Sequence, residues 1–166
     1  MAVANTKSTH ITNADATPPV LTNSSVSCGL LREASGTVET LAADDAGSVY
    51  RMCRVPSNAR ISSILLASDA ITGATAADVG VYKTAADGGA AVDDDFFATN
   101  VDISTAATVF TEVMLEATAT DISKCEQPLW QLLGLSADPC IPYDIAVTVN
   151  DVTAAGTISM KVKYSL

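Results

Sequence analysis

The 166-residue sequence predicts a single all-β domain of about seven or eight antiparallel strands with one short helix, arranged as a sandwich, a jelly roll or an open barrel. Apolar and polar residues alternate in several short segments, which is the period of a half-buried strand. Turn-forming Gly, Pro, Asn and Asp separate these segments at regular intervals. The chain is 48% hydrophobic, 17% charged and poor in aromatics, which is typical of a folded β protein with small side chains.

The clearest elements lie in the last third of the chain. Residues 143–150 and 157–164 alternate strictly, which predicts a half-buried antiparallel pair. A short helix is expected over residues 126–135, with Pro128 in its first turn and Gly134 at its end.

The remaining strands are predicted from shorter or less regular alternating segments. They are expected at residues 36–41, 48–55, 60–68, 78–84, 92–98 and 108–114. Residues 60–68 are the most apolar, so we expect a central strand that is buried on both faces. Residues 28–33 are ambiguous, residues 101–105 are expected to be irregular, and 110–117 could also be read as helix.

Residues 1–27 are polar, contain Pro18-Pro19 and show no periodicity. We therefore expect an extended N-terminal arm, followed by one β-sandwich domain over residues 28–166. An arm of this length is either floppy or lies on a neighbouring subunit, and arms of the second kind are common in assemblies. Met1–His10 has neither an apolar core nor a basic leader, so we expect no signal peptide, no membrane segment and synthesis in the cytoplasm.

The charge pattern argues against nucleic acid as a partner. Nine basic and nineteen acidic residues give a net charge of −10, and phosphate binding needs a basic surface. Residues 69–126 hold eleven acids and two bases, which accounts for −9 of this charge. This surface is either simply solvated or is kept away from packaged DNA and like-charged neighbours.

The cysteines Cys28, Cys53, Cys125 and Cys140 are widely spaced and form no C-x-x-C pair. Zinc is therefore not expected, and cytoplasmic synthesis disfavours disulfides. Cys53 alternates in phase with Val49 and Val55, which predicts a small buried residue.

No catalytic motif is present, and we expect neither an enzyme nor a cofactor. The single histidine, His10, lies in the arm, whereas catalytic histidines need a rigid pocket. Asp93-Asp94-Asp95 lacks the spacing of a calcium loop, so an acidic turn is the better interpretation. Gly88-Gly89 lacks the lysine of a phosphate loop. Trp130 is interpreted as a core or interface anchor.

Contacts with other molecules are expected at seven residues: Lys7, His10, Pro18, Pro19, Arg51, Arg54 and Trp130. Because Arg51 and Arg54 are three apart on one predicted strand, they should lie on opposite faces. One of them could bridge to the acids of a neighbour, or either could be solvated.

Several stretches, taken in order, carry a resemblance. They are Arg54–Ile61, Ile64–Leu66, Asp69–Thr72, Ala77–Tyr82, Asp93–Ala98, Leu129–Leu135 with Pro139, Tyr143–Ile145 and Ala155–Thr157. This order resembles the small virion structural proteins of tailed bacteriophages, of the head decoration or cement kind. The resemblance covers roughly Ser48–Leu166 and leaves the arm and residues 28–46 uncovered.

The resemblance implies a jelly-roll-like protein on the outer capsid surface of the virion. Such a protein would bridge and stabilise subunits of the major capsid protein and associate with itself as a trimer or dimer. A tail, neck or baseplate protein is an alternative, because fold does not fix location. A carbohydrate-binding jelly-roll module is a second alternative, which needs exposed aromatic side chains.

Overall fold

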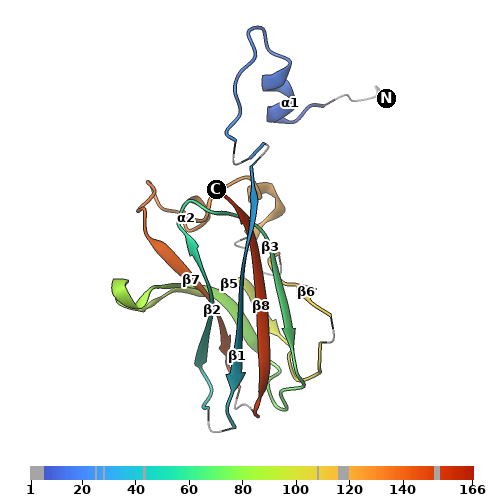
Figure 1. The fold of residues 1–166 in the computed structure, drawn as a ribbon, viewed down its shortest axis with the longest axis vertical. Helices are drawn as coiled ribbons and strands as arrows, with labels where there is room; N and C mark the ends of the chain where they lie inside the picture. Colours follow the sequence, from blue (N-terminus) through green and yellow to red (C-terminus); the bar gives the residue numbers. More distant parts are fainter. Residues whose placement is uncertain are drawn as a thin grey trace.

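The computed structural model describes residues 6–24, 26–27, 29–42, 44–107, 109–115, 120–151 and 154–166. Eight strands form two four-stranded antiparallel sheets (Figure 1). The strands are β1 (Leu31–Thr40), β2 (Ser48–Pro56), β3 (Arg60–Ser68), β4 (Ala77–Lys83), β5 (Ala91–Val101), β6 (Thr111–Glu112), β7 (Pro142–Val149) and β8 (Gly156–Ser165). The helical segments are α1 (Thr9–Ala14), η1 (Ala85–Asp87), η3 (Ile122–Lys124) and α2 (Leu129–Leu132). None of the helices in these ranges has the length and apolarity that crossing a membrane requires.

The strand order is that of a jelly roll. One sheet has the order β1-β8-β3-β6 and the other β2-β7-β4-β5. Strands pair antiparallel from the outside of the sequence inward: β1 with β8, β2 with β7, β3 with β6 and β4 with β5. This long hairpin is rolled up, so that β8 also pairs with β3 and β7 also pairs with β4. This arrangement confirms the predicted all-β sandwich.

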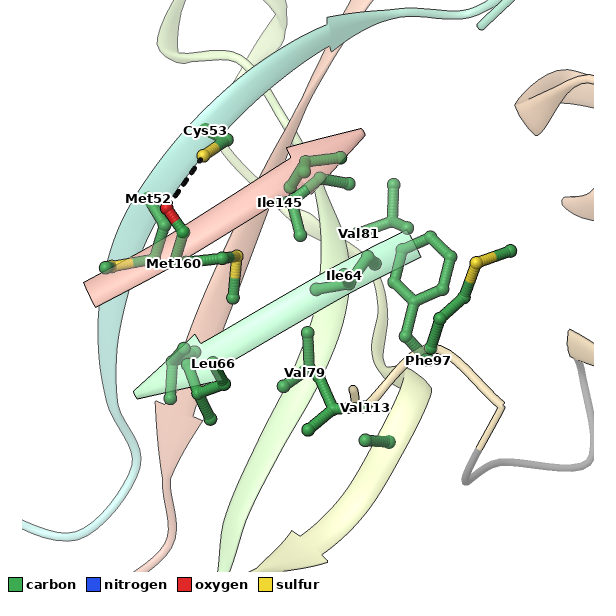
Figure 2. Close-up of a cluster of buried hydrophobic side chains, with 14 of the residues drawn as sticks. Met52, Cys53, Ile64, Leu66, Val79, Val81, Phe97, Val113, Ile145 and Met160 are labelled. Atoms are coloured by element: carbon green, nitrogen blue, oxygen red, sulfur yellow. Dashed lines mark hydrogen bonds between the residues drawn. The ribbon is translucent and has the colours of Figure 1, made fainter. Parts of the chain in front are cut away.

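A single apolar core fills the space between the sheets. Figure 2 shows Ile64 and Leu66 from one sheet facing Val79, Val81 and Ile145 from the other. Phe97 closes one side of this cluster and Met160 the other, and both are almost fully buried. Inward-facing residues of both sheets thus bury a continuous layer, which supplies the main driving force for folding.

The strands that are buried on both faces are β4 and β7. Residues 60–68 form a central strand of their sheet, as predicted, but the expected burial on both faces was wrong. The predicted half-buried pair of residues 143–150 and 157–164 was also wrong, because β7 and β8 lie in different sheets and β7 is buried on both faces. In β3, buried Ile61, Ile64 and Leu66 alternate with more exposed residues, because the outer face of its sheet meets solvent. In contrast, β4 and β7 are the two central strands of the other sheet, whose outer face carries a layer of interacting polar side chains.

Several element boundaries differ from the predicted ones, including that of β5, which runs on to Val101. β1 begins at Leu31, five residues early, and takes in part of the ambiguous stretch, of which Cys28 lies outside the described residues. β6 is only two residues long, and just beyond it the Val113 N–H still donates to the Ile64 carbonyl at 2.9 Å. The Glu112 carboxylate accepts the N–H groups of Ile64 and Met114 at 2.8 and 3.1 Å. Thr108 and residues 116–119 lie outside the described residues, and the described part of the possible helix 110–117 contains strand β6 and no helix.

α2 is shorter than predicted, with four residues instead of ten. Its first N–H groups, from Leu129 and Trp130, donate to the carbonyls of Ala59 and Ser57 in the β2–β3 turn at 2.8 and 2.9 Å. The predicted end at Gly134 is confirmed, because this glycine has a φ of 72°, in the left-handed region. The helix therefore fastens the long β6–β7 connection to one end of the sandwich.

At one edge of the sandwich the two sheets touch through their backbones. A Cβ atom at Gly36 of β1 would overlap the carbonyl group of Met52 in β2. The Cys53 thiol lies beside the same contact and donates to the carbonyl of Ala34 at 3.4 Å. As predicted, Cys53 is buried, and this burial raises the pKa of its thiol to about 11. Cys125 and Cys140 are exposed free thiols.

Candidate functional site

The N-terminal arm and the beginning of β1 expose a set of large apolar side chains. They are Ile11, Val20, Leu21, Leu30 and Leu31, with Leu21 95% exposed. Figure 1 shows this part of the chain projecting beyond one end of the sandwich. Single exposed apolar residues are ordinary, but their accumulation along one projecting segment is typical of a surface that contacts another molecule.

The arm is not wholly extended as the sequence predicted, because it contains the six-residue helix α1. The Ser8 hydroxyl caps the helix by accepting the N–H of Ile11 at 3.4 Å, and Lys7 Nζ reaches Asp15 Oδ2 across the helix at 2.7 Å. No residue of α1 is buried. An isolated helix of this length is only marginally stable in water, and α1 has no buried side chain that would anchor it to the body.

His10 brings α1 to the body of the protein. Its Nε2 atom lies 3.1 Å from Glu126 Oε1, within ion-pair distance. Beside this contact is an open hollow of about 250 Å³, which is also lined by Arg60 and Cys125. The arm therefore has at least one contact with its own chain, which the sequence did not predict.

The other predicted arm residues, Pro18 and Pro19, are exposed. Trp130 on α2 is half-buried, while its neighbour Leu129 is completely buried and provides the core contact. Of the sequence-predicted interface residues, Lys7, His10, Pro18 and Pro19 share the arm, and Trp130 lies on the body.

A second group of candidate residues lies on the outer face of the sheet β2-β7-β4-β5. The pairing of β2 with β7 skips Met52, so that Arg51 is opposite Ala146 and Cys53 is opposite Ile145. This β-bulge adds one residue, and both Met52 and Cys53 point into the core.

Because of the bulge, Arg51 and Arg54 share the outer face, and the prediction of opposite faces was wrong. The bulge also breaks the predicted alternation of Val49 with Cys53: Val49 is 41% exposed, whereas Cys53 is buried. The structure thus brings together two arginines that the period of a regular strand would separate.

Both arginines converge on Asp144, a buried carboxylate of β7. Arg54 donates through Nε to Oδ1 at 2.6 Å and through Nη2 to Oδ2 at 3.1 Å, while Arg51 Nη1 donates to Oδ2 at 3.1 Å. Arg51 also donates to the carbonyls of Lys83 and Gly89, at 2.7 and 2.6 Å. These bonds hold the two guanidinium groups rigidly in place.

The electrostatics of this arginine cluster (Arg51, Arg54 and Asp144) are asymmetric. Burial alone would raise the pKa of Asp144, but hydrogen bonds and charges from Arg54 and Arg51 outweigh it and hold this pKa below its usual value. Two cations face Asp144, whose hydrogen bond raises the pKa of Arg54, and the charge of Asp87 also helps to raise this pKa. The guanidinium of Arg51 also lies over the Tyr82 ring, 5.3 Å from its centroid.

The three aspartates Asp93, Asp94 and Asp95 lie in β5, not in a turn as predicted. Their carboxylates lie within 4.8 Å of one another. Burial, followed by hydrogen bonding and repulsion from Asp95, raises the pKa of Asp93. The strand bulges here, and a Cβ atom at Gly80 of β4 would overlap the Asp94 backbone.

Neither a protein-family model nor a curated protein sequence matches the chain. A chain in the capsid of Ralstonia phage GP4 is structurally similar, with a TM-score of 0.58, 14% sequence identity and coverage of 84% of this chain and 86% of that one. The two chains have the same fold. A chain in the cyanophage Pam1 capsid asymmetric unit aligns with a TM-score of 0.49 and 17% identity, over 83% of this chain and 86% of that one.

The sequence did not identify Asp144 as the centre of a site, although a signal was present. An acid stands between Tyr143 and Ile145 in an otherwise apolar strand, where a carboxylate needs a charged or hydrogen-bonding partner. Tyr82 was seen only as a strand residue. Its contact with Arg51 depends on the spatial order of the strands, which local sequence patterns do not reveal.

Proposed function

We propose that the chain is a structural protein of a phage virion, a decoration or cement protein on the outside of the head. In this role it bridges and stabilises subunits of the major capsid protein, and it requires neither catalysis nor a cofactor. The observation that carries the proposal is the arm, with its exposed apolar side chains and unburied helix α1, on a jelly roll whose fold also occurs in a phage capsid structure.

The distribution of charge supports an orientation on the shell. The loops 41–47, 69–76, 102–110 and 150–155 lie at the end of the sandwich opposite the beginning of β1. They contain five acids, Asp44, Asp45, Asp69, Asp102 and Asp151, and no lysine or arginine. In the proposed orientation the arm end faces the shell and this acidic end points into solvent, where a charged surface limits unwanted association.

The carbohydrate-binding alternative receives little support from the surface. Among the aromatic side chains of the described residues, Phe110 is the one that is exposed, and Lys161 Nζ lies 5.0 Å from its ring centroid. Sugar recognition of the usual kind would need a broader aromatic platform.

The test is a substitution in the arm that leaves the body unchanged. Leu21→Ser removes the most exposed apolar side chain, and we expect its affinity for isolated shells to fall by about tenfold or more, the loss of about 1.4 kcal/mol of apolar contact. Co-sedimentation of the variant with shells over a range of concentrations measures this change. Deletion of residues 1–27 is the stronger variant and should abolish binding.

The matched control is Leu41→Ser, because Leu41 is 61% exposed at the opposite, acidic end. This variant should bind shells as the wild type does. Unchanged binding after removal of the arm, with a body shown to be folded by circular dichroism, would contradict the proposed role of the arm.

A further inference from the structure

The arginine cluster borders an open hollow of about 320 Å³ on the outer face of the sheet, lined by Arg51, Met52, Cys53, Arg54 and Asp144. The Arg54 side chain is 58% exposed, and its Nη1 group has no partner among the residues that the structure describes. Its Nε and Nη2 groups are fixed by Asp144. The hollow therefore presents a preorganised guanidinium with free donors, which suits a carboxylate.

The opposite edge of the same sheet carries the complementary charge. Asp94 and Asp95 of β5 are exposed, and no lysine or arginine in the described part of the chain pairs with them or with Asp93. Three neighbouring carboxylates repel one another, so a cation placed against them relieves an unfavourable interaction.

β2 and β5 are the two edge strands of this sheet, and both contain bulges. Bulged and charged edges resist extension of the backbone ladder. Contact between two copies at these edges is therefore made by side chains, and the charges on them decide which edge meets which. Like edges repel each other, while unlike edges attract.

We propose that the arginine cluster of one molecule receives the Asp93–Asp95 segment of a second copy, so that molecules join head to tail. A single contact of this kind leaves one arginine cluster and one acidic edge open in a dimer, whereas two reciprocal contacts close a two-fold dimer and three or more successive contacts close a ring. The inference rests on the proposed function and names the contact by which the decoration protein associates with itself.

Sedimentation velocity of the purified full chain tests the contact without any shell present. We expect the wild type to associate to at least twice the mass of its 17.0 kDa monomer. Because the pairs are partly exposed, added salt should weaken the association. A double variant, Asp94→Lys with Asp95→Lys, should weaken it by about tenfold or more, since lysines would then face the arginines. Both residues are exposed, so the change leaves the fold intact.

A mixing experiment separates this contact from a general effect of charge. Arg54→Gln alone, shown by circular dichroism to be folded on the remaining bond from Arg51 to Asp144, should also associate weakly. However, its intact acidic edge can bind the intact arginine cluster of the lysine variant, so an equimolar mixture should form dimers and no larger ring. A wild type that stays monomeric, a lysine variant that associates normally or a mixture without dimers would overturn the proposal. Shell binding is read out separately, so a failure of either proposal can be recognised.

Discussion

At the scale of single residues, Asp144 shows how one buried carboxylate orders the outer face of a sheet. It lies in a strand that is buried on both sides, and it receives hydrogen bonds from Arg51 and Arg54. Both arginines are partly exposed, so they could be hydrated without it, whereas Asp144 itself could not remain charged at this depth without them. The cluster is therefore stable only as a whole.

Asp144→Asn should lower the free energy of unfolding by about 2 kcal/mol at neutral pH, after allowance for the exposure of the arginines. Urea denaturation measures this, with Asp45→Asn in the acidic loop as the control that should leave stability nearly unchanged. The pKa of Asp144 is lowered in the folded state, so its contribution is complete above the unfolded value of about 3.9 and is lost as pH falls through the folded pKa. The difference between wild type and variant should therefore shrink below about pH 4. A difference that persists undiminished at pH 2 would contradict this assignment.

The faces of Arg51 and Arg54 could have been predicted from a closer reading of β2. In a regular strand with one buried face, polar and apolar residues alternate. In β2, however, two consecutive apolar residues, Met52 and Cys53, stand between the two arginines. Such a break in the period is the sequence signal of a bulge. The convergence on Asp144 could not have been predicted, because it depends on β7 being the neighbour of β2.

At the scale of elements, the positions of strands were more predictable than their pairing. β7 and β8 lie close to their predicted positions because their alternation is complete, but they lie in different sheets and do not form the predicted pair. α1 was missed because none of its residues is buried, so it lacks the apolar periodicity by which an amphipathic helix is recognised. The β3 prediction failed for a related reason, because small residues such as Ala67 and Ser68 tolerate either a half-buried or a buried face.

The contact between β1 and β2 gives a prediction at this scale. Gly36→Ala would force a methyl group into the Met52 carbonyl, and neither backbone can move without breaking its own ladder. We expect a loss of about 3 kcal/mol in the free energy of unfolding, at the upper end for overpacked sites. Thermal unfolding followed by circular dichroism measures the loss. Ser35→Ala, at the exposed neighbouring position, should behave as the wild type does, and an equal loss in both variants would assign the effect to strand propensity instead.

At the scale of the whole molecule, the fold class could be predicted but the site could not. Alternation and turn spacing are local properties, and they suffice for an all-β sandwich. The order of the strands within the sheets is a property of the complete chain, and it determines that β2 and β5 become opposite edges of one sheet. For this reason the placement of the arginine cluster and the acidic segment at opposite edges of one sheet could not be predicted from the sequence.

The number of copies in each particle distinguishes a head decoration protein from a tail, neck or baseplate protein. A protein that covers a symmetric shell should be present on the order of hundreds of copies, while a tail component follows the low symmetry of the tail and has few. Quantitative mass spectrometry of purified particles, with the major capsid protein as the internal standard, measures this ratio. A count of about a dozen or fewer would favour the tail alternative.

The pairing of Leu31 with Ser165 places the C-terminal end of the sandwich beside the point where the arm departs. A cargo fused after Leu166 would consequently emerge on the shell-facing side in the proposed orientation and would compete with attachment. An insertion within residues 41–47, at the far tip, would instead present a displayed peptide or antigen outward. The pairing of the first strand with the last thus decides where this scaffold can be engineered for display.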